Sequence, residues 1–392
     1  MRYAGIDIAS ETHFVAVVDA AGEVIQKSTS FGEDARGYGK LFELLGPATE
    51  MALVAMEATG HYWKNLFAAL ASNGYQVALL NPLRTNRFAA EDMRRTKTDA
   101  IDAMGIARFA AQKRPAVSRL PEAVTEELRE LIHLRDRLMQ DKQDRVRQLH
   151  RAVDLGFPEF TRHVRSLDSE LATTILSEYP TAEAFLRVRP KTLSNLKYDG
   201  RHFVGLELAT QLLEAAKLSV GAHHGTAYRV QVKYFCQDIN TLRERLRSLD
   251  RDIENRLDDH EVGKLLTTIG GIGSNTAARL VAVLGNPADF RDERALAAYV
   301  GVVPALKQSG KRTGMRAGST HYGNADLRTA LYMPTLVAVR HNPWLKAFYE
   351  RLVAVGKPRK VALIAAMRKL MHAVYSVAKN RKPFVPRLEA AA

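Results

Sequence analysis

Four carboxylates in the first third of the chain have the types and spacing of a divalent-cation site. Asp7 lies within an apolar segment, and Glu57 directly follows an apolar run. Asp99 and Asp102 are three residues apart, so on a helix they share one face. Carboxylates gathered at one place repel one another, and a hard cation with oxygen ligands removes that repulsion. Such an ion can clamp a phosphodiester and stabilise charge on the attacking or leaving oxygen.

Each carboxylate also has a purely structural explanation. An unpaired buried carboxylate is costly, so Asp7 could instead pair with a buried arginine or cap a turn. Asp99 could be the N-cap of its helix, which would leave Asp102 as a solvated residue on the helix surface. The joint placement of all four favours the metal site.

The elements expected in residues 1–115 would bring these carboxylates together. Alternation and turn residues predict three antiparallel strands, then helix, strand, helix, strand and helix, which is the order of an RNase H-like α/β fold. In that fold the first strand, a later strand and the final helix meet at one edge of the sheet. The expected ranges are 3–9, 13–20, 23–31, 37–45, 51–57, 60–71, 76–80 and 99–112.

Three domains are expected along the chain: 1–115, 116–258 and 259–392. Residues 113–121 contain two prolines and are typical of a linker. Charged helices are predicted over 125–153 and 229–257. The first has a heptad-like leucine stripe, so the two could pair as an antiparallel coiled coil. The stretch 156–227 gives no clear pattern.

Residues 262–285 predict a helix-hairpin-helix. Gly271 and Gly273 belong to its glycine turn, which would expose backbone N–H groups to a phosphate at a helix N-terminus. The alternative is a plain tight turn between packed helices. The domain that contains it is expected to be mainly α-helical.

The charge of the chain is concentrated at one end. Residues 301–392 contain 17 of the 57 lysines and arginines but only 3 of the 43 aspartates and glutamates, so they carry the whole net charge of +14. A basic surface confined to one region indicates a polyanionic partner, most simply nucleic acid. The alternative is a solvated surface that serves solubility.

Several other classes of protein do not fit the composition. The single cysteine, Cys236, excludes an internal disulfide framework and a cysteine-rich zinc site. No apolar run approaches the roughly 20 residues of a membrane helix, and the N-terminus is expected to form a strand rather than a signal peptide. A reducing, cytoplasmic location is therefore expected.

Ser309 is a candidate nucleophile in the basic region. It precedes Gly310, whose flexibility suits an exposed tight turn, and cations around it could bind a phosphate. A serine hydroxyl needs activation, and no histidine is adjacent, so the cation at the carboxylates is the candidate activator. A serine in a basic loop can also merely donate a hydrogen bond to phosphate, and Ser274 and Ser319 compete for the role.

The remaining basic residues are expected to contact the nucleic-acid backbone rather than to read bases. The candidates are Lys307, Lys311, Arg312, Arg316, Arg328, Lys357, Arg359, Lys360, Arg368 and Lys369. Tyr62, Trp63 and Tyr322 could stack on bases, although aromatic residues at helix starts are more often part of a core.

The motifs resemble one family closely. The chain is similar to the DEDD transposases of bacterial insertion sequences, in the family numbered one-ten, also described as bridge-RNA-guided recombinases. The resemblance covers roughly 1–150 and 255–392, and 156–227 looks like an insertion relative to shorter members of the family. The matching segments are GIDIA, MEATGHYW, KTDAIDA, TIGGIGSNTAARLVAVLG, AAYVGVVPALKQSGKRTG, HYGNADLRTALYMP and GKPRKVALIAAMRKL.

The resemblance implies a function more specific than composition can. It implies a RuvC-like first domain that binds Mg²⁺ through Asp7, Glu57, Asp99 and Asp102, and a transient phosphoserine bond to DNA at Ser309. It also implies a tetramer, arranged as a dimer of dimers, and a structured non-coding RNA that pairs with donor and target DNA.

Two other hypotheses stay open. A junction resolvase or nuclease would hydrolyse DNA with the carboxylates alone. A nucleic-acid-binding protein without enzymatic activity would use only the hairpin and the basic region. The four carboxylates argue against the second hypothesis, and the resemblance argues against the first.

Overall fold

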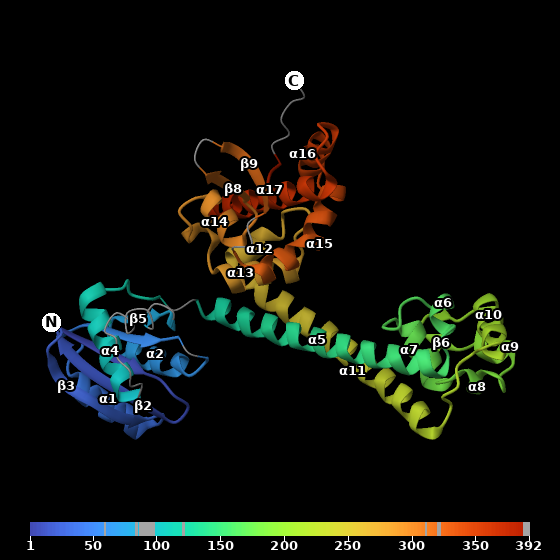
Figure 1. The fold of residues 1–392 in the computed structure, drawn as a ribbon, viewed down its shortest axis with the longest axis horizontal. Coiled ribbons are helices and arrows are strands. Elements are labelled where there is room, and N and C mark those ends of the chain that lie inside the picture. The colour runs from blue at the N-terminus through green and yellow to red at the C-terminus, as the bar shows by residue number, and fades with distance from the viewer. Residues whose placement is uncertain are drawn as a thin grey trace. The chain divides into compact units, whose positions relative to one another are not determined.

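In the computed structural model the chain folds as two compact units, Met1–Leu120 and Pro121–Ala392 (Figure 1). The structure describes residues 1–58, 60–82, 85, 99–119, 122–309, 312–319 and 323–386. It describes their side chains except at 99, 100, 304–309 and 312–319.

The first unit is built on a five-stranded sheet. Its strands are β1 (Arg2–Asp7), β2 (Thr12–Asp19), β3 (Val24–Gly32), β4 (Met51–Glu57) and β5 (Val77–Leu80), in the order β3-β2-β1-β4-β5. The β1–β2 and β2–β3 pairs are antiparallel, whereas β1–β4 and β4–β5 are parallel. This is the RNase H-like order that the sequence predicted.

Helices cover both faces of this sheet. Helices α1 (Ala35–Leu45) and α2 (Trp63–Ser72) pack on one face, where Ile6, Val15 and Met56 are buried. Helix α4 (Asp99–Lys113) packs on the other, against Tyr3 and Ala55. Strand β1 ends at Asp7, two residues before the predicted end, so Asp7 is the last residue of its strand rather than an interior one. The other predicted strands and helices of this unit agree with the structure to within two residues, except at the start of α2. That helix begins at Trp63, after a turn that includes Gly60 at φ +56°.

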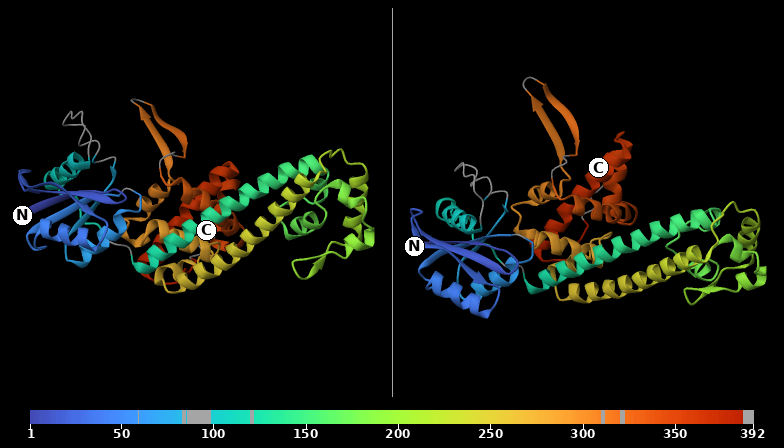
Figure 2. Two further views of the ribbon diagram at one scale, coloured as in Figure 1. Left: turned by 90° about the horizontal axis from the view of Figure 1, so that it is seen from below. Right: turned by 60° about the horizontal axis from the view of Figure 1, so that its bottom comes forward.

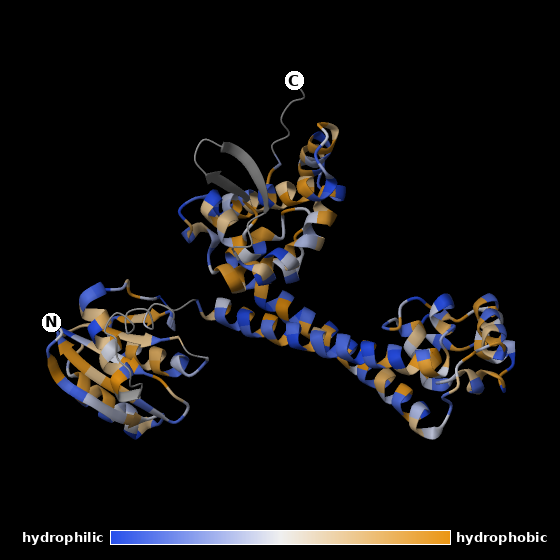
Figure 3. Ribbon diagram, viewed as in Figure 1, coloured by the Kyte–Doolittle hydropathy of each residue, from blue (hydrophilic) through white to orange (hydrophobic). Residues whose placement is uncertain are grey.

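Two long helices form the middle of the second unit. Helices α5 (Ala123–Gly156) and α11 (Thr226–Asp258) run side by side in Figures 1 and 2. Hydrophilic residues predominate along both in Figure 3. Leu128 and Ile132 are buried near the start of α5, and Ile253 and Leu257 near the end of α11, so the helices pair antiparallel. A coiled-coil supercoil stays a prediction.

The stretch without a clear sequence pattern is a packed helical subdomain. It comprises α6 (Phe160–His163), α7 (Glu170–Glu178), α8 (Ala182–Phe185), α9 (Pro190–Ser194), β6 (Lys197–Tyr198), β7 (His202–Phe203) and α10 (Leu206–Lys217). Phe157 is buried between Phe160 and Phe185, with ring centroids 5.9 and 5.1 Å away. Most of these helices are too short to give a clear helical periodicity in the sequence.

The other end of the helix pair carries the C-terminal elements. These are α12 (Glu261–Leu266), α13 (Ser274–Leu284), η1 (Pro287–Asp289), α14 (Glu293–Val300), the β8 (Pro304–Ser309) and β9 (Arg312–Ser319) hairpin, α15 (Ala325–His341), α16 (Pro343–Ala354) and α17 (Arg359–Asn380). By length and composition alone α17 could cross a membrane, but Leu363, Met367, Leu370 and Val374 are buried in the core of these helices.

Gly5 permits the closest helix–sheet contact in the first unit. A Cβ at Gly5 would lie 2.1 Å from the Ala107 nitrogen and 2.4 Å from the Ala103 oxygen, both on α4. We expect Gly5→Ala to lower the free energy of unfolding of this unit by about 3 kcal/mol, because backbone cannot yield as a side chain can. Urea titration monitored by Trp63 fluorescence, with Trp344 replaced by phenylalanine, measures it.

Gly39→Ala is the matched control for this prediction. Gly39 lies within α1 with nothing near its missing Cβ, so alanine should leave stability unchanged or raise it by up to about 1 kcal/mol. Equal effects of the two substitutions would contradict the close contact at Gly5.

Candidate active site

Asp7 and Glu57 lie at the same edge and on the same face of the sheet. Strands β1 and β4 are parallel neighbours, and Ile6 pairs with Met56. Asp7 follows Ile6 as the last residue of β1, and Glu57 follows Met56 as the last residue of β4. Side chains alternate between faces along a strand. Two residues earlier, Gly5 and Ala55 face α4, so Asp7 and Glu57 also lie on the face that α4 covers.

Helix α4 supplies the other two predicted carboxylates. Asp99 is its first residue, and the half-buried Asp102 directly precedes Ala103, whose carbonyl lies against Gly5 of β1. The side chain of Asp99 is outside the described set. Among the described side chains, no three carboxylate, histidine or cysteine groups are close enough to hold a metal ion together.

Thr85 is a neighbour of Glu57 that the sequence did not reveal. Its buried hydroxyl lies within hydrogen-bonding distance of Glu57 Oε1 and 3.0 Å from the Pro82 carbonyl oxygen. Donation to Glu57 orients that carboxylate. The only signal in the sequence is a threonine three residues after a proline, a spacing common in ordinary turns.

The proposed nucleophile lies at the end of a β-hairpin. Ser309 is the last residue of β8 and pairs in register with Arg312, the first residue of β9. The side chains of Lys307, Ser309, Lys311, Arg312 and Arg316 fall outside those described, as do Ser319 and Tyr322. Ser274 donates to Glu254 Oε1 at 3.1 Å, so its hydroxyl already has an acceptor.

The glycine turn between α12 and α13 has a structural role. Gly271 has φ +105°, and a Cβ there would lie 2.5 Å from Ala338 Cβ on α15. The N-terminus of α13 also faces carboxylates of α11, because Asn275 donates to Asp250 at 3.1 Å. Asp250 is itself paired with Arg135 at 2.7 Å, so its charge is compensated. The contact with Ala338 supports a packing role for Gly271, and phosphate binding at Gly271 and Gly273 stays a prediction.

The predicted backbone contacts differ in their surroundings. Arg328 donates to the Val300 carbonyl oxygen at 3.1 Å, and the Lys369 ammonium lies over the Trp344 and Phe348 rings at 4.6 and 4.4 Å. Arg359 and Lys360 are exposed at the start of α17, and Lys357 and Arg368 are half-buried. Arg359 and Lys360 are therefore the more accessible phosphate contacts.

The two aromatic candidates in the first unit also differ in their exposure. Trp63 packs edge-on against Phe67, with centroids 6.1 Å apart, and belongs to the core under α2. Tyr62 is more exposed and contacts only His61 among the described ring pairs, at 4.3 Å. Trp63 is thus a packing residue, whereas Tyr62 is accessible.

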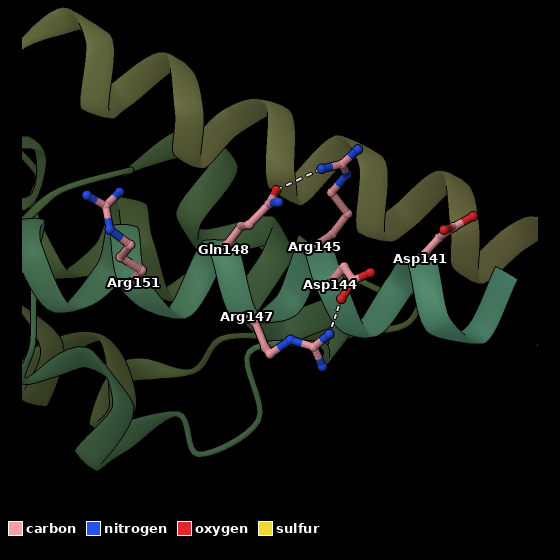
Figure 4. Close-up of a pocket in the computed structure, with 6 residues that line it drawn as sticks. All are labelled: Asp141, Asp144, Arg145, Arg147, Gln148 and Arg151. Carbon is pink, nitrogen blue, oxygen red and sulfur yellow. Dashed lines mark hydrogen bonds and ion pairs between the residues drawn. The ribbon is translucent and has the colours of Figure 1, made fainter. Parts of the chain in front are cut away.

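The charged hollow on α5 shown in Figure 4 is an ion-paired helix surface. Arg147 pairs with Asp144 one turn away, and Arg145 donates to Gln148 at 2.7 Å. Arg145 also lies 3.0 Å from Asp238 on α11. Paired charges of this kind stabilise the helices weakly and give no reactive group.

The fold and the carboxylate edge define an RNase H-like domain of the type found in DNA-cleaving enzymes. Residues 4–158 match the profile of the DEDD transposase domain of IS110, described as a transposase. Residues 263–350 match a second profile, described as the transposase of the IS116/IS110/IS902 family. The chain belongs to this family of transposases, which are enzymes that act on DNA.

Relatives match along almost the whole chain. It is 27% identical to the "Insertion element IS116 uncharacterized 44.8 kDa protein" of Streptomyces clavuligerus, over 98% of this chain and 96% of that protein. It is 26% identical to the "Pilin gene-inverting protein" of Moraxella bovis, over 98% of each. It is also 26% identical to the "Mini-circle putative transposase for IS117" of Streptomyces coelicolor, over 100% of this chain and 98% of that protein.

Arg328 and Lys360 should respond differently to removal of their charge. We expect Lys360→Ala to reduce the slope of log affinity for duplex DNA against log salt by about 1, without change in melting temperature. Arg328→Ala should lower the melting temperature, because it leaves the Val300 carbonyl without its donor. Fluorescence anisotropy over a KCl series and thermal scans measure both. An unchanged salt slope in Lys360→Ala would contradict a phosphate contact.

Proposed function

We propose that this transposase is an RNA-guided DNA recombinase that cleaves and rejoins donor and target DNA through a phosphoserine intermediate at Ser309. The observation that carries the proposal is that Asp7 and Glu57 lie at the same edge and on the same face of the sheet. Helix α4, which has Asp99 and Asp102 in its first turn, covers that face. Carboxylates are the donor set of a hard cation, so the residues fit Mg²⁺.

Asp7, Glu57, Asp99 and Asp102 would hold the cation, with Thr85 orienting Glu57. The bound ion would neutralise charge on a phosphodiester and stabilise its leaving oxygen.

Ser309 would form the covalent link to DNA. Its Oγ attacks the phosphorus and loses its proton, a Ser–O–P bond forms, and one P–O bond of the DNA backbone breaks. The released deoxyribose hydroxyl takes up a proton. In the second step a hydroxyl from another strand attacks the phosphoserine, so the backbone is resealed and Ser309 is restored without any oxidant or energy-rich cofactor.

The alternative is metal-dependent hydrolysis by a junction resolvase or nuclease, which needs no serine. The relative named for inverting a pilin gene supports recombination, because inversion requires that every cut strand be rejoined. Hydrolysis would lose the free energy of the cleaved phosphodiester bond, which is needed to rejoin the strands. A phosphoserine retains it.

The family resemblance adds two partners to the proposal: a bridge RNA that pairs with donor and target DNA, and further copies of the chain in a homo-oligomer. Basic side chains in 301–392 would hold nucleic-acid backbone, while sequence would be read by base pairing between RNA and DNA. This division of labour requires few protein contacts to base edges.

Ser309→Ala should abolish a covalent protein–DNA adduct. The full-length protein would be incubated with RNA from the element end, donor and target DNA and Mg²⁺, then run on denaturing gels. Wild type and Ser319→Ala should give adduct and recombinant product, and Asp102→Asn should reduce both by at least about 100-fold. Cleavage without adduct that persists in Ser309→Ala would establish the hydrolytic alternative instead.

A further inference from the structure

A fully buried histidine lies behind the carboxylate edge of the first unit. His13 is on β2, has no exposed surface, and packs against Phe31 with ring centroids 5.1 Å apart. It belongs to the α1/α2 side of the sheet, opposite the face of Asp7 and Glu57. It cannot reach DNA, so any contribution to the reaction must act through other residues.

The hydrogen bonds of His13 give its two ring nitrogens different roles. Nδ1 lies 3.3 Å from the Ala9 backbone nitrogen and accepts its proton. Nε2 therefore carries the ring proton and donates it to Glu33 Oε2 at 2.7 Å. The ring thus connects the turn directly after Asp7 with the residue that follows β3.

Glu33 is the centre of this hydrogen-bond network. Tyr38 on α1 donates to its Oε2 at 2.8 Å, and Asn65 on α2 donates to its Oε1 at 3.4 Å. Burial raises the pKa of Glu33, but the hydrogen bonds from Tyr38, His13 and Asn65 outweigh it and leave the pKa below its usual value. Burial and then Glu33 raise the pKa of Tyr38, so the phenol remains a donor at neutral pH.

The turn between β1 and β2 is held from both sides by this network. His13 takes the Ala9 N–H, and the Glu33 N–H donates to the Glu11 carbonyl oxygen at 3.2 Å. Asn65 adds a link to α2, the helix that follows Glu57 in the chain. The network therefore braces the turn that follows Asp7 and links it to α2.

We propose that His13 is a positioning residue that holds the Asp7 end of β1 in place for cation binding. This inference rests on the proposed function of the carboxylates. Stability alone gives little reason for such a network, because an apolar side chain of similar volume would avoid the cost of burying polar groups. Hydrogen bonds from fixed directions give the turn one defined position. Loss of a group bonded directly to a metal ligand commonly changes metal affinity by about 10- to 100-fold, and because His13 acts through the backbone of Ala9 we expect an effect at the lower end of that range.

Mn²⁺ binding to the full-length protein, measured by electron paramagnetic resonance, tests the proposal without DNA or turnover. His13→Phe keeps a planar ring, although a larger one, and removes both hydrogen bonds, and we expect it to weaken Mn²⁺ affinity by about tenfold. His13→Asn places an acceptor near the Ala9 N–H and should restore part of the loss. Phe31→Leu is the matched control, because it disturbs the packing of the same ring without removing a hydrogen bond.

The outcomes separate positioning from general stability. The proposal is supported if His13→Phe weakens Mn²⁺ binding while Phe31→Leu, at a similar melting temperature, stays within about twofold of wild type. Wild-type affinity in His13→Phe, or equal weakening in both variants, overturns it.

Asp7→Asn distinguishes failure of the proposed metal site from failure of the positioning role proposed for His13. If Asp7→Asn leaves Mn²⁺ binding unchanged, the proposed carboxylate site is wrong, and amide hydrogen exchange of residues 8–12 then decides on His13. Faster exchange in His13→Phe than in Phe31→Leu supports the brace, and equal exchange overturns it.

Discussion

The contact between helix α4 and strand β1 sets the geometry on which the catalytic domain depends. Glycine at position 5 lets the α4 backbone approach the strand so closely that a single Cβ would overlap Ala107 and Ala103. Because strand residues alternate between faces, the same contact defines the side of the sheet on which Asp7 and Glu57 lie. The first turn of α4, with Asp99 and Asp102, is fixed to that side by the same contact.

The C-terminal part is organised by a different constraint, which is the burial of α17. Its apolar residues form the core on which α12 to α16 pack. Among the described side chains of 301–392, the basic ones lie outside this core. Some of these cations have structural partners, as Arg328 and Lys369 show, and others, such as Lys360, are exposed. Charge counts alone do not separate the two groups.

The strands and their carboxylates could be predicted from sequence because alternation and apolar runs are local signals. The pattern places Glu57 at the end of its strand, as observed, but it places Asp7 inside a strand that reaches residue 9, two residues beyond the observed end of β1. The position of the two carboxylates at one edge follows from the pairing of their strands. Contacts distant in sequence gave no such signal. Thr85 meets Glu57 through a turn, and His13 meets Glu33, Tyr38 and Asn65 only after the sheet and helices have packed.

Glycine shows the same difference between local and distant causes. A glycine turn before a helix predicted phosphate binding at Gly271, because its backbone N–H groups were expected to be open. In the structure Gly271 is required by the close passage of Ala338, and Asp250 and Glu254 lie near the helix start. A conformation that only glycine adopts can therefore serve packing as well as binding, and the neighbours decide which.

The most direct test of the central claim is anomalous diffraction from crystals of the full-length protein soaked with Mn²⁺. The account predicts a peak bound by carboxylate oxygens of Asp7 and Glu57 at about 2.1 Å, with Asp102 or Asp99 completing the site. Peaks found only elsewhere, with Asp7 and Glu57 coordinating nothing, would contradict a cation-dependent active site at this edge of the sheet.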